Sequence, residues 1–98
     1  MYKDIITYEL ADNITKEKLI TVAGQVFNDW MKNQAGFIKW EIHLNRGGSY
    51  TDIVYWKSRE DAKRAEGEMT NIPNASDWYA CYKEGTISIK GLTAVAEF

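Results

Sequence analysis

The chain has 98 residues, 45% of them hydrophobic, which suffices for one domain over residues 1–98 and leaves no room for a second. Its formal net charge of −2 excludes a strongly basic surface, so we expect no nucleic-acid partner. The single cysteine, Cys81, excludes an intrachain disulfide and a cysteine-based zinc site. No apolar run reaches the length of a signal peptide or membrane span, so we expect a cytoplasmic protein with no membrane partner.

The first third of the chain predicts a strand and then a long helix. Residues 2–10 carry apolar groups on both faces, which is typical of a strand covered on both sides. Asp12 and Asn13 supply a turn and side chains that can cap a helix. From residue 15 to residue 34, apolar residues recur with the 3.6-residue period of an amphipathic helix.

Residues 37–57 predict a β-hairpin. Two alternating runs flank a loop with two consecutive glycines, which adopt positive φ without a steric penalty. Pairing about the centre of this loop would bring together Trp40 with Val54 and Ile38 with Trp56.

The last third predicts a second helix and a final strand. Ser58 is a suitable N-cap, and Asp61 three residues later completes a near capping box for a helix over 58–69. Residues 86–96 are typical of a strand, in which Gly91 predicts a bulge or bend.

The resulting order, βαββαβ, is the α+β, ferredoxin-like arrangement: a four-stranded antiparallel sheet with two helices on one face. This arrangement leaves the other face of the sheet bare. Several strands carry apolar or aromatic residues on both sides, so we expect that face to be covered. A second copy of the chain is the simplest cover, and it predicts a homodimer with the two sheets face to face.

Three segments carry a family resemblance: Gln34–Ile38 entering the second strand, Asp52–Ser58 leaving the third, and Glu60–Ala65 opening the second helix. In these segments the chain resembles the dimeric α/β-barrel superfamily that includes the antibiotic-biosynthesis monooxygenase-like proteins, and it looks closest to small, uncharacterised members. The resemblance implies a small-molecule pocket between sheet and helices. It says more about fold than about function.

Members of that superfamily differ in chemistry. Some are cofactor-independent oxygenases acting on aromatic polyketides or quinols, whereas others bind haem or cyclise or isomerise small molecules. The monooxygenases use Asn, Trp, Tyr and Arg around the substrate; Trp56 is the nearest positional match here, and no Asn or Arg is assigned. Gly91 stands where some relatives have a His, which argues against a His-dependent reaction.

Aromatic side chains are the candidates for lining such a pocket, because they stack on a flat ligand and donate hydrogen bonds. The candidates are Tyr8, Trp40, Tyr55, Trp56 and Trp78. The alternative is that these residues fill the core and the dimer interface.

His43, the only histidine, is a candidate general acid or base. It shares a strand face with Lys39 and Glu41, so the alternative is an exposed histidine near a strand end. No cluster has the spacing of a metal site, and we expect neither a metal nor a cofactor.

Three hypotheses about function follow. The first is a cofactor-independent monooxygenase acting on an aromatic or quinol-like substrate. The second is a non-catalytic dimer of the same fold that binds a small aromatic ligand, and the third is an interaction module with a filled core. A cavity between sheet and helices would exclude the third.

Overall fold

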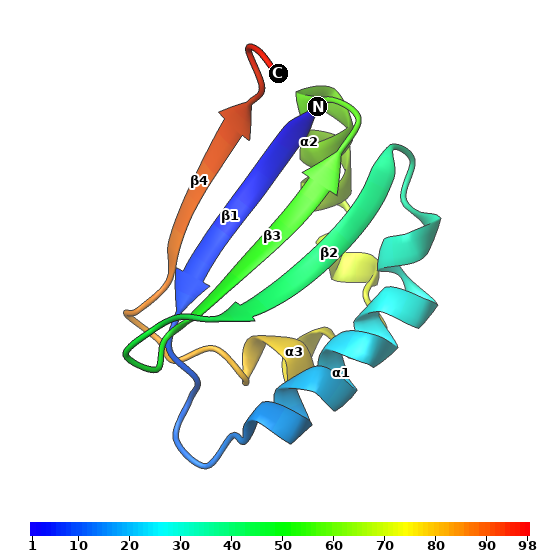
Figure 1. The fold of residues 1–98 in the computed structure, drawn as a ribbon. Coiled ribbons are helices and arrows are strands. Elements are labelled where there is room, and N and C mark those ends of the chain that lie inside the picture. The colour runs from blue at the N-terminus through cyan, green and yellow to red at the C-terminus, as the bar shows by residue number, and fades with distance from the viewer.

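A computed structural model describes residues 1–98. One antiparallel sheet has the strand order β2-β3-β1-β4 (Figure 1). Its strands are β1 (Tyr2–Tyr8), β2 (Phe37–Leu44), β3 (Tyr50–Trp56) and β4 (Ser88–Thr93). The helices are α1 (Lys16–Asp29), α2 (Arg59–Gly67) and α3 (Ala75–Tyr79), with 3₁₀ turns at Met31–Asn33 and Met69–Asn71. The predicted ferredoxin-like fold is confirmed, with one additional short helix.

The helices end earlier than the periodicity predicts. The N-cap of α1 is Thr15, whose hydroxyl accepts a 3.1 Å hydrogen bond from the Lys18 amide. Trp30 follows directly after Asp29, and its backbone is no longer helical although its side chain is buried. The apolar periodicity of the sequence therefore continues beyond the end of the helix. At α2 the predicted cap is confirmed, since the Ser58 hydroxyl accepts from the Asp61 amide at 3.2 Å. None of the helices combines the length and the apolar character that a membrane span requires.

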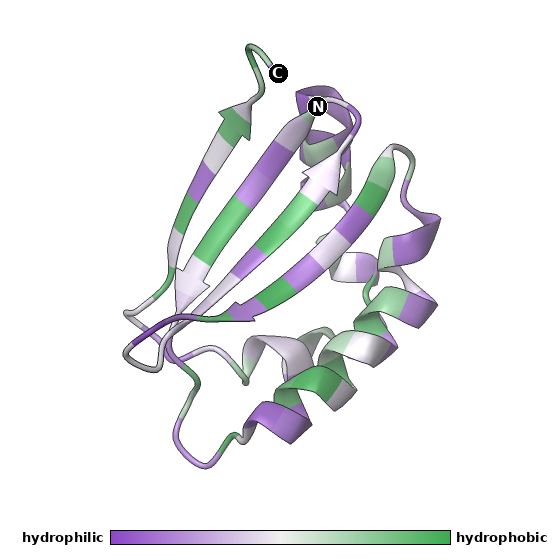
Figure 2. Cartoon of the chain, viewed as in Figure 1, coloured by the Kyte–Doolittle hydropathy of each residue, from purple (hydrophilic) through white to green (hydrophobic).

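Strand β3 decides which side chains meet the helices. Its alternate residues are buried toward them: Tyr50, Asp52, Val54 and Trp56. Figure 2 shows the resulting alternation of polar and apolar positions along the strands. Trp40 pairs with Val54 as predicted, whereas Trp56 pairs with Phe37 instead of Ile38, because the register shifts between Phe37 and Lys39.

Gly91 does not form the predicted bulge. The register between β1 and β4 runs through it without a shift, and Gly91 pairs with Asp4. The ring of Tyr2 instead occupies the space that a Cβ at Gly91 would need. Glycine here makes room for an aromatic side chain from the neighbouring strand.

The sheet face opposite the helices is more polar than the sequence predicts. Ile5 and Ile53 pair at its centre and are half-buried within the single chain. Thr7 and Thr51 lie beside them, 3.2 Å apart at their hydroxyl oxygens. Strict alternation explains the difference, since the bulky residues of β3 mostly belong to the helix side.

Candidate functional site

A cavity of about 360 Å³ lies between the helix-facing side of the sheet and the helices. All four tryptophans of the chain line it: Trp30, Trp40, Trp56 and Trp78. Its volume falls within the usual range of small-molecule sites, and 14 of its 17 lining residues are hydrophobic. A filled core without a pocket, the third hypothesis, is therefore wrong.

Three of the tryptophans come from β2, β3 and α3, where ring contacts hold them in place, and Trp30 lies directly after α1. Trp56 ends β3, and its ring meets that of Phe37 edge-on, with centroids 5.7 Å apart. Trp40 of β2 meets Trp78 of α3 edge-on at 5.6 Å. Edge-to-face packing is a favourable geometry for aromatic pairs, so these walls are preorganised before any ligand arrives.

The cavity opens to solvent beside β4. Ile87, Ile89 and Tyr79 line it and are nevertheless exposed, at 47%, 68% and 50% respectively. The helices do not extend over this part of the sheet, as Figure 1 shows for β4 at the edge. A ligand can therefore enter on this side.

One carboxylate lies in the cavity wall with almost no exposure. Asp52 is 1% exposed, and it is the only buried charged residue of the chain. The Tyr8 hydroxyl donates to its Oδ1 at 2.7 Å, and the Tyr82 hydroxyl donates to its Oδ2 at 2.8 Å. Both oxygens are thus held in place, and each retains a lone pair for a further partner.

Tyr82 reaches Asp52 because the chain after α3 is tied to the end of β1. Leu10 and Tyr82 form an isolated antiparallel bridge, and the Lys83 amide donates to the Glu9 carbonyl at 2.9 Å. The Trp78 indole then donates to the Tyr82 hydroxyl at 3.1 Å. A continuous chain of hydrogen bonds runs from the Trp78 indole through Tyr82 to the carboxylate.

Burial and the hydrogen bonds between Asp52, Tyr8 and Tyr82 shift the pKa of all three groups. Burial raises the pKa of Asp52 above its ordinary value, and the hydrogen bonds from Tyr8 and Tyr82 oppose that rise. Burial together with the Asp52 charge raises the pKa of both tyrosines, so they remain hydrogen-bond donors at neutral pH. Asp52 is therefore a carboxylate in the cavity wall that is suited to accept a proton.

Two indole N–H groups in the cavity wall have no hydrogen-bond partner. Nε1 of Trp40 and Nε1 of Trp56 are both buried. Buried polar groups without partners are rare in folded proteins and cost free energy. The Trp40 N–H is nevertheless close enough to Asp52, and the Trp56 N–H to Asp4, to lower the pKa of each carboxyl group, although burial dominates both shifts.

The predicted site residues divide between the two faces of the sheet. Trp40, Trp56 and Trp78 line the cavity, and Tyr8 lies behind it, connected through Asp52. Tyr55 lies on the opposite face.

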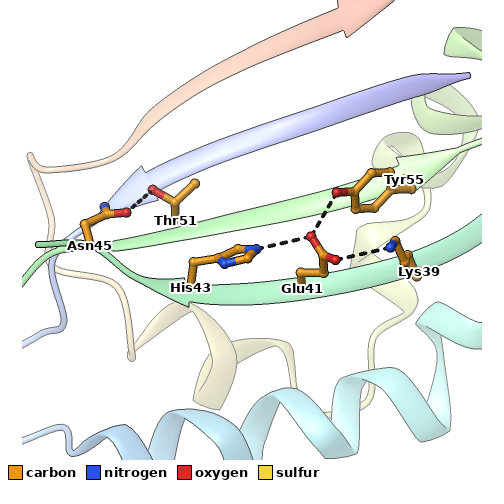
Figure 3. Close-up of polar contacts among 6 residues, drawn as sticks. All are labelled: Lys39, Glu41, His43, Asn45, Thr51 and Tyr55. Atoms are coloured by element: carbon orange, nitrogen blue, oxygen red, sulfur yellow. Dashed lines mark hydrogen bonds and ion pairs between the residues drawn. The ribbon is translucent and has the colours of Figure 1, made fainter. Parts of the chain in front are cut away.

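On that opposite face, Glu41 collects three partners (Figure 3). It accepts from the Tyr55 hydroxyl at 2.9 Å, contacts His43 at 3.1 Å and pairs with Lys39 at 3.2 Å. These hydrogen bonds, with that of His43 the largest, lower the pKa of Glu41 to about 2. His43 is half exposed and remote from the cavity lining. No group of three or more His, Cys, Asp or Glu side chains has the geometry to hold a metal ion.

Sequence reasoning missed Asp52 and Asp4, which also lines the cavity. A signal existed for the two acids. Each stands at a helix-facing position of its strand, where an apolar residue is expected. From the sequence, the segment after Pro73 that carries Tyr82 is a candidate lid of the pocket, but the contact of Tyr82 with Asp52 depends on the bridge to Leu10.

Comparisons with known proteins establish the fold. No protein-family model matches the chain, and no curated protein matches it by sequence. Among solved structures, SnoaB, a cofactor-independent oxygenase from Streptomyces nogalater, superimposes with a TM-score of 0.74 at 16% identity, over 98% of this chain and 94% of that one. The chain has the fold of this oxygenase.

Two further structures share that fold. A monooxygenase from the ActVA-Orf6 gene of Streptomyces coelicolor, in complex with the ligand nanaomycin D, gives a TM-score of 0.74 at 15% identity, over 99% and 89% of the two chains. A conserved protein from Methanosarcina mazei Go1 gives 0.70 at 8% identity, over 93% and 89%. The predicted resemblance is confirmed for the fold.

Proposed function

We propose that this protein is a cofactor-independent monooxygenase that acts on an electron-rich aromatic substrate, a phenol or a quinol. The observation that carries the proposal is the indole-lined cavity with one buried carboxylate, Asp52, in its wall. The shared fold with two oxygenases supports it by analogy.

The cavity supplies what a direct reaction with oxygen needs. The substrate ring packs against Trp56, and Asp52 removes a proton from the phenol, which concentrates electron density on the ring carbon opposite the hydroxyl. Dioxygen adds at that carbon, its O–O bond then breaks, and the ring C–H bond is lost. A phenol and dioxygen thus give a quinone and water: the ring is oxidised, one oxygen atom enters the quinone, and the other leaves as water.

The test is oxygen consumption with a panel of phenols, quinols and catechols. Asp52→Asn keeps the shape of the side chain and removes its basicity, so we expect the rate to fall by about a hundredfold or more. Tyr55→Phe, on the opposite face, is the matched control and should leave the rate unchanged. Ligand binding without oxygen consumption above the uncatalysed rate would replace this proposal with the non-catalytic ligand-binding function.

We propose further that two copies associate through the open sheet face. The central pair Ile5–Ile53 and the exposed Leu92 of β4 supply apolar area, and the Glu41 cluster is already satisfied within one chain. A specific dimer buries about 800 Å² or more per chain. Light scattering at micromolar concentration should give a dimer, and Ile53→Arg should give a folded monomer. A monomeric parent chain would contradict the proposal.

A further inference from the structure

All charged side chains that line the cavity are acidic. They are Asp4, Asp52 and Glu66. No lysine, arginine or histidine lines the cavity. An anionic ligand would therefore lose its hydration and meet only like charge.

Two of these carboxylates have no cationic partner in the chain. The four ion pairs of the structure involve Lys39, His43, Arg64 and Lys83, and none of them reaches Asp4 or Glu66. Burial raises the pKa of Asp4, and the neighbouring charge of Glu66 raises it further. The two acids thus share one end of the cavity, where a cation would relieve their repulsion.

The indole of Trp56 lies at the same end of the cavity. Trp56 is 3% exposed, and its Nε1 atom is buried without a hydrogen-bond partner. Its N–H is still close enough to lower the pKa of Asp4, although burial dominates the net shift. This end of the cavity therefore offers two carboxylates without a cationic partner for the charge of a ligand, and the Trp56 N–H faces one of them.

The remaining walls are aromatic faces. The four tryptophans and Tyr79 line the cavity, and the faces of such rings attract organic cations. Rings combined with unpaired carboxylates form the usual recognition chemistry for an ammonium group on an apolar body.

We infer that the cavity selects an arylalkylamine, whose ring lies among the tryptophans and whose ammonium group lies between Asp4 and Glu66. The reaction of that ligand rests on the proposed monooxygenase function; its binding does not. The substrate class is accordingly a phenol or catechol with a short aminoalkyl chain.

The experiment compares three catechols that differ only in the charge of the side chain. Dopamine carries an ammonium, 4-ethylcatechol is neutral, and 3,4-dihydroxyphenylacetate carries a carboxylate. Titration calorimetry under argon, at pH 7 and low salt, measures binding without oxidation. We expect dopamine to bind about tenfold or more tightly than 4-ethylcatechol, and the carboxylate to bind most weakly.

Variants assign the preference to the two acids. Glu66→Gln alters an exposed side chain, so it should reduce the preference for dopamine without affecting folding. Asp4→Asn should reduce it as well, whereas Glu60→Gln, on the same helix but outside the cavity lining, should not. The preference should also weaken at high salt.

Equal binding of the three catechols, a preference for the carboxylate, or no measurable binding of dopamine would overturn the inference. An unchanged preference in both Glu66→Gln and Asp4→Asn would do the same. If dopamine binds selectively but no oxygen is consumed, the inference stands and the proposed reaction fails.

Discussion

The Tyr8 hydroxyl donates a 2.7 Å hydrogen bond to Oδ1 of Asp52, joining β1 to β3 at the wall of the cavity. A buried carboxylate is costly unless its oxygens are satisfied. The hydrogen bonds to Asp52 therefore affect stability, and because they oppose the rise in its pKa, they also affect the readiness of the carboxylate to accept a proton.

Tyr8→Phe should destabilise the protein at pH 7 by about 1.5–3 kcal/mol, because it leaves a charged acceptor without one of its donors. Urea unfolding measures the change. Tyr50→Phe is the matched control: Tyr50 is buried and its ring lies 6.0 Å from that of Tyr8, but it makes no hydrogen bond to Asp52. Equal effects of the two substitutions would show that the bond contributes little.

The stability of the protein relative to Asp52→Asn should depend on pH. Since the pKa of Asp52 is raised in the folded state, the folded chain holds this proton to a higher pH than the unfolded chain does. As pH rises from the unfolded to the folded pKa, the contribution of Asp52 to stability falls. Unfolding measured from pH 4 to pH 7 should therefore move in favour of Asp52→Asn, and a difference independent of pH would contradict the raised pKa.

Trp56→Ala should lower the free energy of unfolding by about 3–5 kcal/mol, the range for truncating a large buried aromatic side chain. Trp56 is 3% exposed and packs edge-on against Phe37. Thermal unfolding is the measurement, and Trp56→Phe should recover part of the loss. A melting temperature within a degree or two of the parent would show that Trp56 contributes to the cavity wall but not to the core.

His43 should be dispensable for activity. It lies on the sheet face opposite the cavity, is half exposed, and contacts Glu41 instead of any lining residue. His43→Gln removes proton exchange while keeping size and polarity, so the rate should stay within a few-fold of the parent. A loss of about a hundredfold with folding intact would make His43 an acid–base residue.

Tyr55 and Trp56 lie on opposite faces of the sheet, and the alternation of side chains along a strand already predicts this. Neighbours in a strand point to opposite faces, so only one of the two can line a pocket on the helix side. The positions of Asp4 and Asp52 were predictable in the same way, because these acids interrupt helix-facing rows of apolar residues. The face of the sheet that each of these residues occupies depends only on the two-residue period of its own strand.

The order of the elements, the Ser58 cap and the pairing of Trp40 with Val54 are all predictable from the sequence, since each depends on short-range periodicity or capping chemistry. The gathering of four tryptophans from distant segments around one cavity becomes visible only in three dimensions, as does the contact of Tyr82 with Asp52, 30 positions away. Such contacts depend on how the segment after α3 packs against β1. No periodicity within a single element encodes that packing.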